Sequence, residues 1–564
     1  MTINRVGTPQ SRRGPSVRTN GSVRGRLSSL AVGGALLGLV AAGCTGAPST
    51  ERVEPGQQSS TGSDKGQGTG DTGEATGDAG QGTGGGTGPA TGGAGAVPEG
   101  LEEFYGQDIA WESCDGGECA TLTVPIDYDE PDGSTIELAL LRVPAGDSSQ
   151  GSLVLNPGGP GGSGVDYARS AGMVYSDTVR EHYDIVGFDP RGVGQSAPIT
   201  CFDDARMDEW IGFDPTPDDA AEEEAALQQG RDFAAACEEN SGELLGHVST
   251  VEVVRDMDVL RSALGQEQLD YFGASYGTVL GATYAELFPA NVGRFVLDGA
   301  VDPTMVGIDS AVAQTEGFER ATRAYVEDCV AQGDCPLGGD VDSAMQAIPD
   351  LLAQLDAEPI PLDSDPAGEL TEGWAMYGIV VAMYDQAGWP ILTQAIRSAQ
   401  DGDGTMLMFL ANLYFDRGTD GTHNSNSSQA FYAVQCLDSS NNDAPEVDDE
   451  EALRRYVEAS PTWGRHFATM DKSTCEDWPV AIDGPPLTEY TAEGAAPIVV
   501  IGTTRDPATP YEQAVALADM LDSGVLVSFD GDGHTAYGRS NDCVDDAIDA
   551  FLTEGTVPED GLSC

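Results

Sequence analysis

The sequence predicts an α/β fold in which a largely parallel, doubly wound sheet forms the core and a mainly helical segment is inserted as a cap. Strand-like apolar runs alternate with helical segments over residues 151–299, which is typical of parallel strands joined by crossover helices. The alternation stops over 302–496 and returns at 497–564. We therefore expect residues 101–301 and 497–564 to build the core and residues 302–496 to form the cap.

Short apolar runs and segments of helical spacing support this prediction. The predicted strand regions are 111–128, 136–143, 151–156, 183–188, 269–274, 295–299, 497–502 and 524–529. A helix is predicted at 251–264, because Val254, Met257, Leu260 and Leu264 recur at helical spacing before Gly265. Further helical segments at 318–329, 344–355 and 374–385 indicate that the insertion is mainly helical.

A Gly-x-Ser-x-Gly motif stands at the centre of the predicted core. Gly273-Ala274-Ser275-Tyr276-Gly277 follows an apolar run and precedes a helix-forming segment, which is the strand, sharp turn and helix context of a nucleophile elbow. The flanking glycines are expected because a Cβ there would collide with neighbouring backbone. The alternative is a glycine-rich turn with an incidental serine, since short motifs also occur by chance.

An acid and a histidine follow the last two predicted strands. Asp506 lies after the 497–502 run and His534 after the 524–529 run, where the catalytic loops of open α/β sheets are found. A serine nucleophile needs a base, and the base needs an orienting carboxylate. The order Ser275, Asp506, His534 is that of α/β-hydrolases, so we predict this catalytic triad. Each partner taken singly also fits a loop residue, and Asp532 is the main rival acid.

A glycine-rich loop at 157–164 supplies the remaining part of such a site. It follows an apolar strand and would bring backbone N–H groups close to a ligand. We predict that the amides of Gly159 and Tyr276 form the oxyanion hole, because Pro160 has no N–H to donate. A flexible turn and a phosphate cradle are the alternatives, although no Gly-Lys-Ser or Gly-Lys-Thr follows.

The N-terminal region is typical of an exported chain. Several arginines precede an apolar run at 30–42, which is too short to span a bilayer comfortably. Small residues directly before Cys44 resemble a lipobox, so residues 1–43 are predicted to be a signal peptide and Cys44 to be lipidated. Ala41 stands where a larger aliphatic residue is usual, which leaves plain secretion as the alternative. Residues 45–100 are rich in Gly, Thr and Ser, which predicts a disordered tether.

Ten cysteines follow Cys44, and an even number in an exported chain indicates disulfides. Their spacing suggests pairing of neighbours in the sequence. The predicted pairs are Cys114 with Cys119, Cys201 with Cys237, Cys329 with Cys335, Cys436 with Cys475, and Cys543 with Cys564. No Cys-x-x-Cys pair occurs and the five histidines are scattered, so we expect no zinc site. No other metal or cofactor is predicted.

The charge balance excludes one class of partner. Acidic residues number 93 against 27 basic ones, which gives a formal net charge of -66. Such a chain would repel nucleic acid. Surface solvation explains the acidity equally well, because net charge bears on solubility and association rather than on chemistry.

Several motifs together resemble a known family of exopeptidases. The loop Pro157-Gly158-Gly159-Pro160-Gly161 is similar to the His-Gly-Gly-Pro-Gly loop of prolyl aminopeptidases, with Pro157 in place of the histidine. The resemblance to the exported tripeptidyl aminopeptidase branch covers about residues 111–564. It is carried by 156–164, 189–196, 273–277 and 506–510, and also by Cys436-Leu437-Asp438 and Cys475-Glu476-Asp477-Trp478-Pro479.

This resemblance implies a secreted or lipid-anchored serine exopeptidase that trims short peptides, most simply tripeptides, from free N-termini. Its partners would be such peptides, and it would meet the membrane only through the lipid anchor on the outer face of the cell. Asp438 is a candidate for binding the substrate α-ammonium, since a buried carboxylate is suited to that role. The alternatives are a cell-surface esterase or lipase with the same triad, and an inactive surface binding protein.

Overall fold

The computed structural model describes residues 97–564, apart from 147–148, 442–443, 445–446, 476 and 483–484. The predicted signal peptide, Cys44 and the predicted tether up to residue 96 lie outside the described residues. In the part of the chain that is described, we find no helix that is both long and apolar enough to cross a bilayer.

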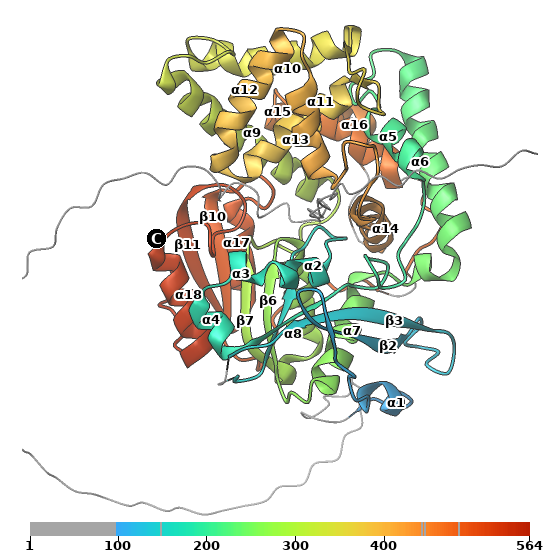
Figure 1. Cartoon of the computed structure of the whole chain (residues 1–564), viewed down its shortest axis with the longest axis vertical. Coiled ribbons are helices and arrows are strands. Elements are labelled where there is room, and N and C mark those ends of the chain that lie inside the picture. Colours follow the sequence, from blue (N-terminus) through green and yellow to red (C-terminus); the bar gives the residue numbers. More distant parts are fainter. Residues whose placement is uncertain (1–96, 147–148, 442–443, 445–446, 476, 483–484) are drawn as a thin grey trace, which may run out of the picture. The chain divides into compact units, whose positions relative to one another are not determined.

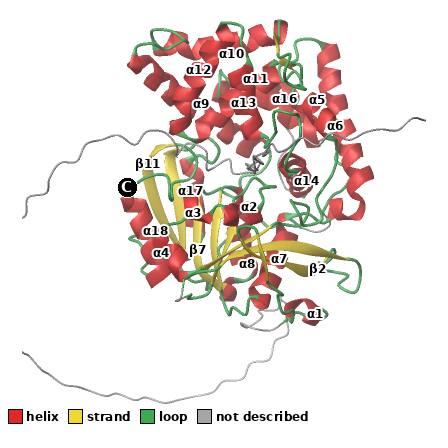
Figure 2. Ribbon diagram, viewed as in Figure 1, coloured by secondary structure: helices red, strands yellow, loops and turns green. Residues whose placement is uncertain are grey.

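The core is a sheet that is parallel over most of its width, which confirms the predicted fold class (Figure 2). The strands from β5 to β12 run parallel, and β1, β2 and β3 join antiparallel at one edge. In spatial order they are β1 (Glu112–Cys114), β2 (Gly117–Pro125), β3 (Thr135–Val143), β5 (Asp184–Phe188), β4 (Ser152–Asn156), β6 (Leu269–Ala274), β7 (Val292–Asp298), β10 (Ile498–Arg505), β11 (Gly524–Asp532) and β12 (Leu562–Ser563).

Helices cover both faces of this sheet, so the central strands are apolar on both sides. Along β6, Tyr271 packs into the apolar cluster with α7 and α8, whereas the next residue, Phe272, packs into the cluster with α2, α4 and α18. The core helices are α1 (Glu102–Tyr105), α2 (Gly164–Arg169), α3 (Ala171–Val174), α4 (Asp177–His182), α7 (Thr250–Ala263), α8 (Tyr276–Leu287), α17 (Tyr511–Met520) and α18 (Asp542–Glu554).

The segment between β7 and β10 is mainly helical. It contains α9 (Ile308–Gln332), α10 (Val341–Ala357), α11 (Glu372–Val380), α12 (Trp389–Gln400), α13 (Thr405–Tyr414), α14 (Ser427–Ser439), α15 (Asp449–Ala459), α16 (Gly464–Cys475) and the short pair β8 (Ile360–Pro361) and β9 (Glu369–Leu370). This segment also contains the short 3₁₀ turns η3 (Val381–Tyr384) and η4 (Gln386–Gly388). Two further 3₁₀ turns, η1 (Gly242–Gly246) and η2 (Pro289–Asn291), precede β7.

Two helices from the first core segment lie with this helical group. Figure 1 shows α5 (Asp204–Ile211) and α6 (Ala220–Ser241) beside α16. The contact is so close that a Cβ on Gly230 would stand 1.7 Å from the Ser473 carbonyl oxygen. The acidic stretch of sequence around α6 gives no sign of this partner, because the contact is made by a glycine backbone.

Five disulfides join the cysteines in the neighbouring pairs that the spacing predicts. They are Cys114–Cys119, Cys201–Cys237, Cys329–Cys335, Cys436–Cys475 and Cys543–Cys564. The Cys436–Cys475 bond fastens α14 to α16, so it holds two cap helices together.

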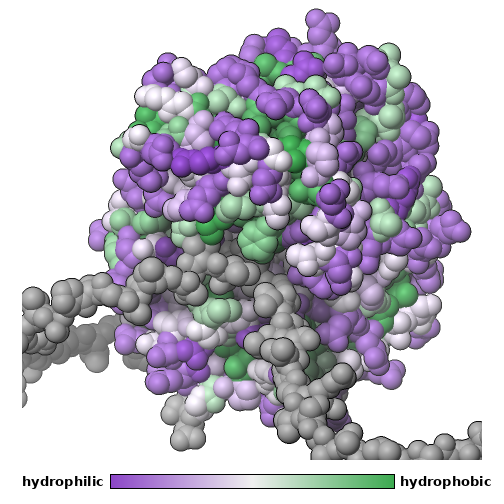
Figure 3. All heavy atoms as spheres, turned by 45° about the horizontal axis from the view of Figure 1, so that its top comes forward, coloured by the Kyte–Doolittle hydropathy of each residue, from purple (hydrophilic) through white to green (hydrophobic). Residues whose placement is uncertain are grey.

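Hydrophilic side chains are spread widely over the face of the molecule drawn in Figure 3. This distribution agrees with the excess of acidic over basic residues in the sequence. It favours solvation of the surface as the simplest explanation of the acidity.

Candidate active site

Ser275 lies at the sharp turn between β6 and α8, where the sequence predicted a nucleophile elbow. Its φ of 57° and ψ of -125° are rare for a residue with a side chain. Its N–H donates to the carbonyl oxygen of Asp298 at 2.8 Å, and its own carbonyl oxygen accepts from the Thr278 N–H at 2.8 Å. These bonds hold the strained residue in place.

Glycines are required around this turn because the backbone approaches itself closely. A Cβ on Gly273 would stand 2.3 Å from the Gly277 carbonyl oxygen, and one on Gly277 would stand 2.7 Å from the Asn156 carbonyl oxygen. One on Gly158 would stand 2.9 Å from the Ser275 Cβ. The glycine loop therefore lies directly against the serine.

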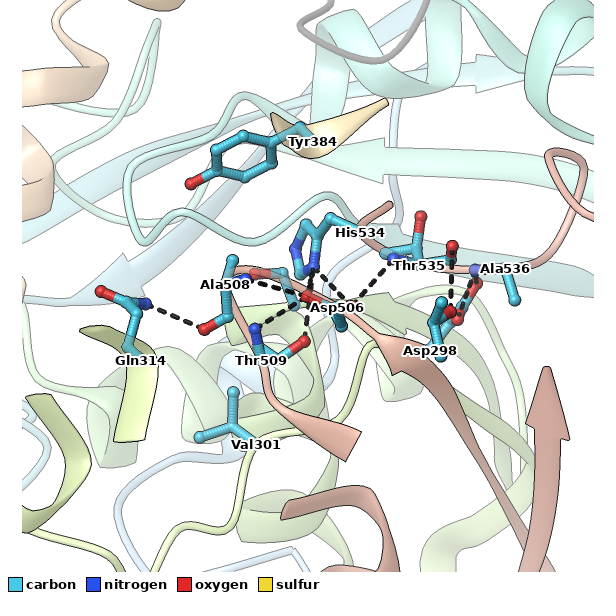
Figure 4. A network of polar contacts seen from close by, with 12 residues as sticks. Asp298, Val301, Gln314, Tyr384, Asp506, Ala508, Thr509, His534, Thr535 and Ala536 are labelled. Carbon is cyan, nitrogen blue, oxygen red and sulfur yellow. Dashed lines mark hydrogen bonds and ion pairs between the residues drawn. The ribbon is translucent and has the colours of Figure 1, made fainter. Parts of the chain in front are cut away.

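Asp506 and His534, which are far apart in the sequence, form a buried pair (Figure 4). The His534 Nδ1 lies 2.9 Å from both Asp506 carboxylate oxygens. A carboxylate only accepts, so Nδ1 carries the proton and Nε2 is left to act as a base. Asp506 also accepts from the N–H groups of Ala508, Thr509 and Thr535. Asp506 is fully buried, and these donors fix the orientation of its carboxylate.

The surroundings fix the histidine ring from three sides. The backbone N–H of His534 donates to the Tyr384 carbonyl oxygen at 2.9 Å. The Tyr384 ring packs edge-on against the imidazole, with 5.4 Å between ring centroids. The Thr509 hydroxyl lies 3.3 Å from Nδ1. A Cβ on Gly299, whose φ is 65°, would stand 3.2 Å from the His534 Cε1. A cap residue, Tyr384, thus takes part in placing the base.

Two amides beside Ser275 are free to bind an oxyanion. The Gly158 N–H is occupied, since it donates to the Asn156 Oδ1 at 2.8 Å. Among the described residues, neither the Gly159 nor the Tyr276 N–H donates to a protein acceptor. These are the two donors that the sequence predicted. Within the same described part of the chain, no hydrogen bond links the Ser275 hydroxyl to His534, and such bonds often tighten only when substrate binds.

The rival residues lie elsewhere. Asp532 forms an ion pair with Arg505, with 2.7 Å between its Oδ1 and the Arg505 Nε. Each of the other histidines forms a hydrogen bond through a ring nitrogen. The partners are the Thr178 carbonyl oxygen for His182, Glu252 for His247, Asp208 for His423 and Glu372 for His466.

Asp438 is connected to the site through one threonine. Its carboxylate accepts from the Thr250 N–H at 3.0 Å and from the Thr250 hydroxyl at 2.6 Å. The same hydroxyl lies 2.6 Å from the Tyr276 OH, on the residue next to Ser275. Burial raises the pKa of Asp438 to about 6, although its bonds to Thr250 oppose the shift.

Carboxylates that could hold a cation lie apart from the triad. Among the described residues, oxygens of Asp214, Asp356 and Glu372 approach within 4.8 Å of one another, as do those of Asp218, Asp219 and Glu222. Glu372 is already bound to His466 and to the Thr216 hydroxyl. The chemistry of Ser275 requires none of them.

Sequence reasoning did not single out Asp298, which lies at the end of β7. Its carboxylate accepts from the N–H groups of Ala536 and Tyr537 in the loop that carries His534. The sequence contains one indication of its importance, namely the position of Asp298 at the carboxyl end of a core strand. An acid in an ordinary loop can have the same position, so this indication was not specific.

Comparison with known proteins assigns the chain to a family. Residues 460–564 match the model described as TAP-like protein, and residues 151–342 match the model of the alpha/beta hydrolase fold. Serine protease Hip1 of Mycobacterium tuberculosis is 38% identical over 481 residues, which cover 81% of this chain and 91% of that protein. The chain belongs to the TAP-like α/β-hydrolase family.

Two further relatives show the range of activities in the TAP-like family. Carboxylesterase B of Mycobacterium tuberculosis is 37% identical over 476 residues, which cover 81% of this chain and 89% of that protein. Tripeptidyl aminopeptidase of Streptomyces coelicolor is 32% identical over 478 residues, with coverage of 81% and 86%. This TAP-like chain is therefore a serine hydrolase, and the names of its relatives include both peptidases and an esterase.

The triad geometry generates a test with a matched control. We expect Asp506→Asn to lower kcat by about 10³- to 10⁴-fold, because the imidazole loses the carboxylate that selects its tautomer. Asp532→Asn removes the rival acid, which pairs with Arg505 and not with His534, and should leave kcat much closer to the wild-type value than Asp506→Asn does. Fluorophosphonate labelling followed by peptide mapping should mark Ser275 in folded wild type. Unlabelled Ser275, or equal losses in the two variants, would contradict the assignment.

Proposed function

We propose that this chain is an exported serine aminopeptidase that releases short peptides, most simply tripeptides, from free N-termini. The observation that carries the proposal is the partly buried Asp438 carboxylate, which is linked through Thr250 to Tyr276, the neighbour of Ser275. A carboxylate in a low-dielectric setting suits a substrate ammonium. Hydrolysis of an ester does not require recognition of an ammonium group.

In the proposed reaction, His534 Nε2 takes the proton of the Ser275 hydroxyl as its oxygen attacks the scissile carbonyl carbon. The Gly159 and Tyr276 amides stabilise the oxyanion. The C–N bond then breaks, and His534 gives the proton to the leaving amine. The N-terminal fragment stays on Ser275 as an ester until water, activated by His534, releases it. Asp506 holds the ring and stabilises its charge throughout.

The position of α14 supports an exopeptidase. A Cβ on Gly161 in the glycine loop would stand 2.3 Å from the Ser427 carbonyl oxygen, at the start of α14. The Gln429 side chain accepts from the Cys201 N–H, and Asn426 accepts from the Gly194 N–H. This helix is thus fastened to the core beside the oxyanion loop. A fixed wall there would limit how many substrate residues can extend on the N-terminal side of the cleaved bond.

The second candidate is a cell-surface esterase, which the likeness to carboxylesterase B supports. The same triad would hydrolyse an ester with an alcohol in place of the leaving amine. The substrate ammonium separates the two candidates, because only the peptidase needs to recognise it.

Peptides of graded length, each with a free and an acetylated N-terminus, test the proposal. Mass spectrometry should detect tripeptides released from the free forms. Acetylation should lower kcat/KM by about 10- to 100-fold, since a hydrogen bond to a charged group contributes roughly 1.5–3 kcal/mol. Ser275→Ala should show no release. Equal cleavage of both forms would favour an esterase or an endopeptidase and contradict the aminopeptidase.

Asp438 can be tested against a variant that breaks the same contact but keeps the charge. We expect Asp438→Asn to raise KM for free-amine peptides by about tenfold, the value of a hydrogen bond to a charged group. N-blocked esters should be unaffected. Thr250→Val removes the hydroxyl that donates to Asp438 and leaves the carboxylate in place, so it should raise this KM less. Equal loss of N-blocked ester hydrolysis in Asp438→Asn would reject the ammonium role.

We also propose that Cys44 carries a lipid that holds the enzyme at the outer face of the cell membrane, with residues 45–100 as the tether. The small residues before Cys44 and the composition after it support this location. Cys44→Ser should move the protein from the membrane fraction into the medium. An unchanged distribution between these fractions would contradict lipid anchoring.

A further inference from the structure

The end of β7 touches every part of the proposed triad. The Asp298 carbonyl oxygen accepts the Ser275 N–H at 2.8 Å. A Cβ on the next residue, Gly299, would stand 3.2 Å from the His534 Cε1 and 3.3 Å from the Thr509 hydroxyl. One residue pair at a strand end therefore meets the nucleophile turn, the base and the loop of the acid.

The Asp298 side chain holds the loop that carries the base (Figure 4). Its Oδ1 lies 2.9 Å from the Ala536 N, and its Oδ2 lies 3.1 Å from the Ala536 N and 2.9 Å from the Tyr537 N. The residue is 1% exposed. Its main chain thus binds the serine while its side chain binds the histidine loop, so it sets the spacing between them.

We propose that Asp298 is a positioning residue that fixes the His534 loop relative to Ser275, and that its negative charge supports the imidazolium formed during catalysis. This inference rests on the proposed function of Ser275 as the nucleophile. Among the described residues, the Asp298 carboxylate accepts from the backbone of residues 536–537 and not from the imidazole nitrogens, so it acts through that backbone.

A carboxylate suits this position better than an amide would. An ionised carboxylate offers only acceptors, and both of its oxygens face N–H groups here. An asparagine would turn its NH₂ toward one of those donors and leave it unsatisfied. The loop would then shift, and small displacements of a catalytic group are costly for the rate.

The charged surroundings of Asp298 are specific. Burial raises its pKa to about 6, while the Tyr537 and Ala536 amides and the charge of His534 oppose the shift and Asp506 adds to it. Tyr167 faces it from α2. Arg539 donates to the His534 carbonyl oxygen and reaches the same region. The carboxylate is ionised above about pH 6 and becomes neutral below it.

Asp298→Asn provides the test, with Asp270→Asn as a matched control. Asp270 is an acid on a core strand that also accepts a backbone N–H, that of Arg294 at 2.7 Å, but it is only partly buried and lies at the start of β6. We expect Asp298→Asn to lower kcat about 10- to 100-fold with KM nearly unchanged, the size expected of a displaced catalytic group. Asp270→Asn should keep kcat within about twofold. A similar kcat in all three proteins would overturn the inference.

The pH profile distinguishes positioning from a merely structural role. With an N-blocked ester, which avoids Asp438, the wild-type log kcat/KM should fall more steeply below about pH 6 than that of Asp298→Asn, because protonation of Asp298 removes the charge that positions the loop. Asp298→Asn has no carboxylate to protonate at this position, so its acid limb should be shallower. Identical slopes in wild type and variant would overturn the inference.

Hydrogen exchange of the wild-type protein keeps the test independent of whether the variant folds. After correction for intrinsic rates, the peptide that covers residues 534–540 should lose protection between pH 8 and pH 5, while the β7 peptide 292–297 should not. Equal protection at both pH values would reject the role of the charge. Ser275→Ala separates the two proposals: residual activity in that variant contradicts the proposed function, whereas an inactive Ser275→Ala beside a fully active Asp298→Asn contradicts only this inference.

Discussion

The site depends on how closely the main chain packs around Ser275. Its φ of 57° is held by a hydrogen bond to Asp298 and by the contact with Gly158, and a Cβ on Gly273 would collide with the Gly277 carbonyl oxygen. This strain turns the hydroxyl away from the sheet. It also leaves the Tyr276 amide, the first of α8, without an acceptor among the described residues. In the proposed reaction, this turn would supply both the nucleophile and one oxyanion donor.

Two buried carboxylates act on the same histidine in different ways. Asp506 binds the ring nitrogen, whereas Asp298 binds the backbone of the loop two residues further on. Both are surrounded by backbone N–H groups, which offset the cost of burying charge. In the proposed reaction, the imidazole would gain its positive charge in a region that is already arranged to stabilise it, so little reorganisation would be needed.

The helix α14 connects the two tasks of the proposed enzyme. It lies against the glycine loop at Gly161, is linked to α16 by Cys436–Cys475, and carries Asp438 to the start of α7. Recognition of the substrate amine and stabilisation of the oxyanion would then share one rigid support. A further cap contact, at Tyr384, fixes the backbone of His534. Cap and core are thus in contact beside the proposed catalytic residues.

The sequence by itself determined the parallel α/β core and the order of serine, acid and histidine, because strand periodicity and glycine-rich turns are local properties of the chain. Cysteine spacing predicted the disulfide pairs for the same reason. Only the tertiary structure decided that Asp298 holds the His534 loop and that Asp438 reaches Tyr276 through Thr250, since these partners are far apart in the sequence. In so acidic a chain, a carboxylate reveals its role only through the N–H groups that surround it after folding.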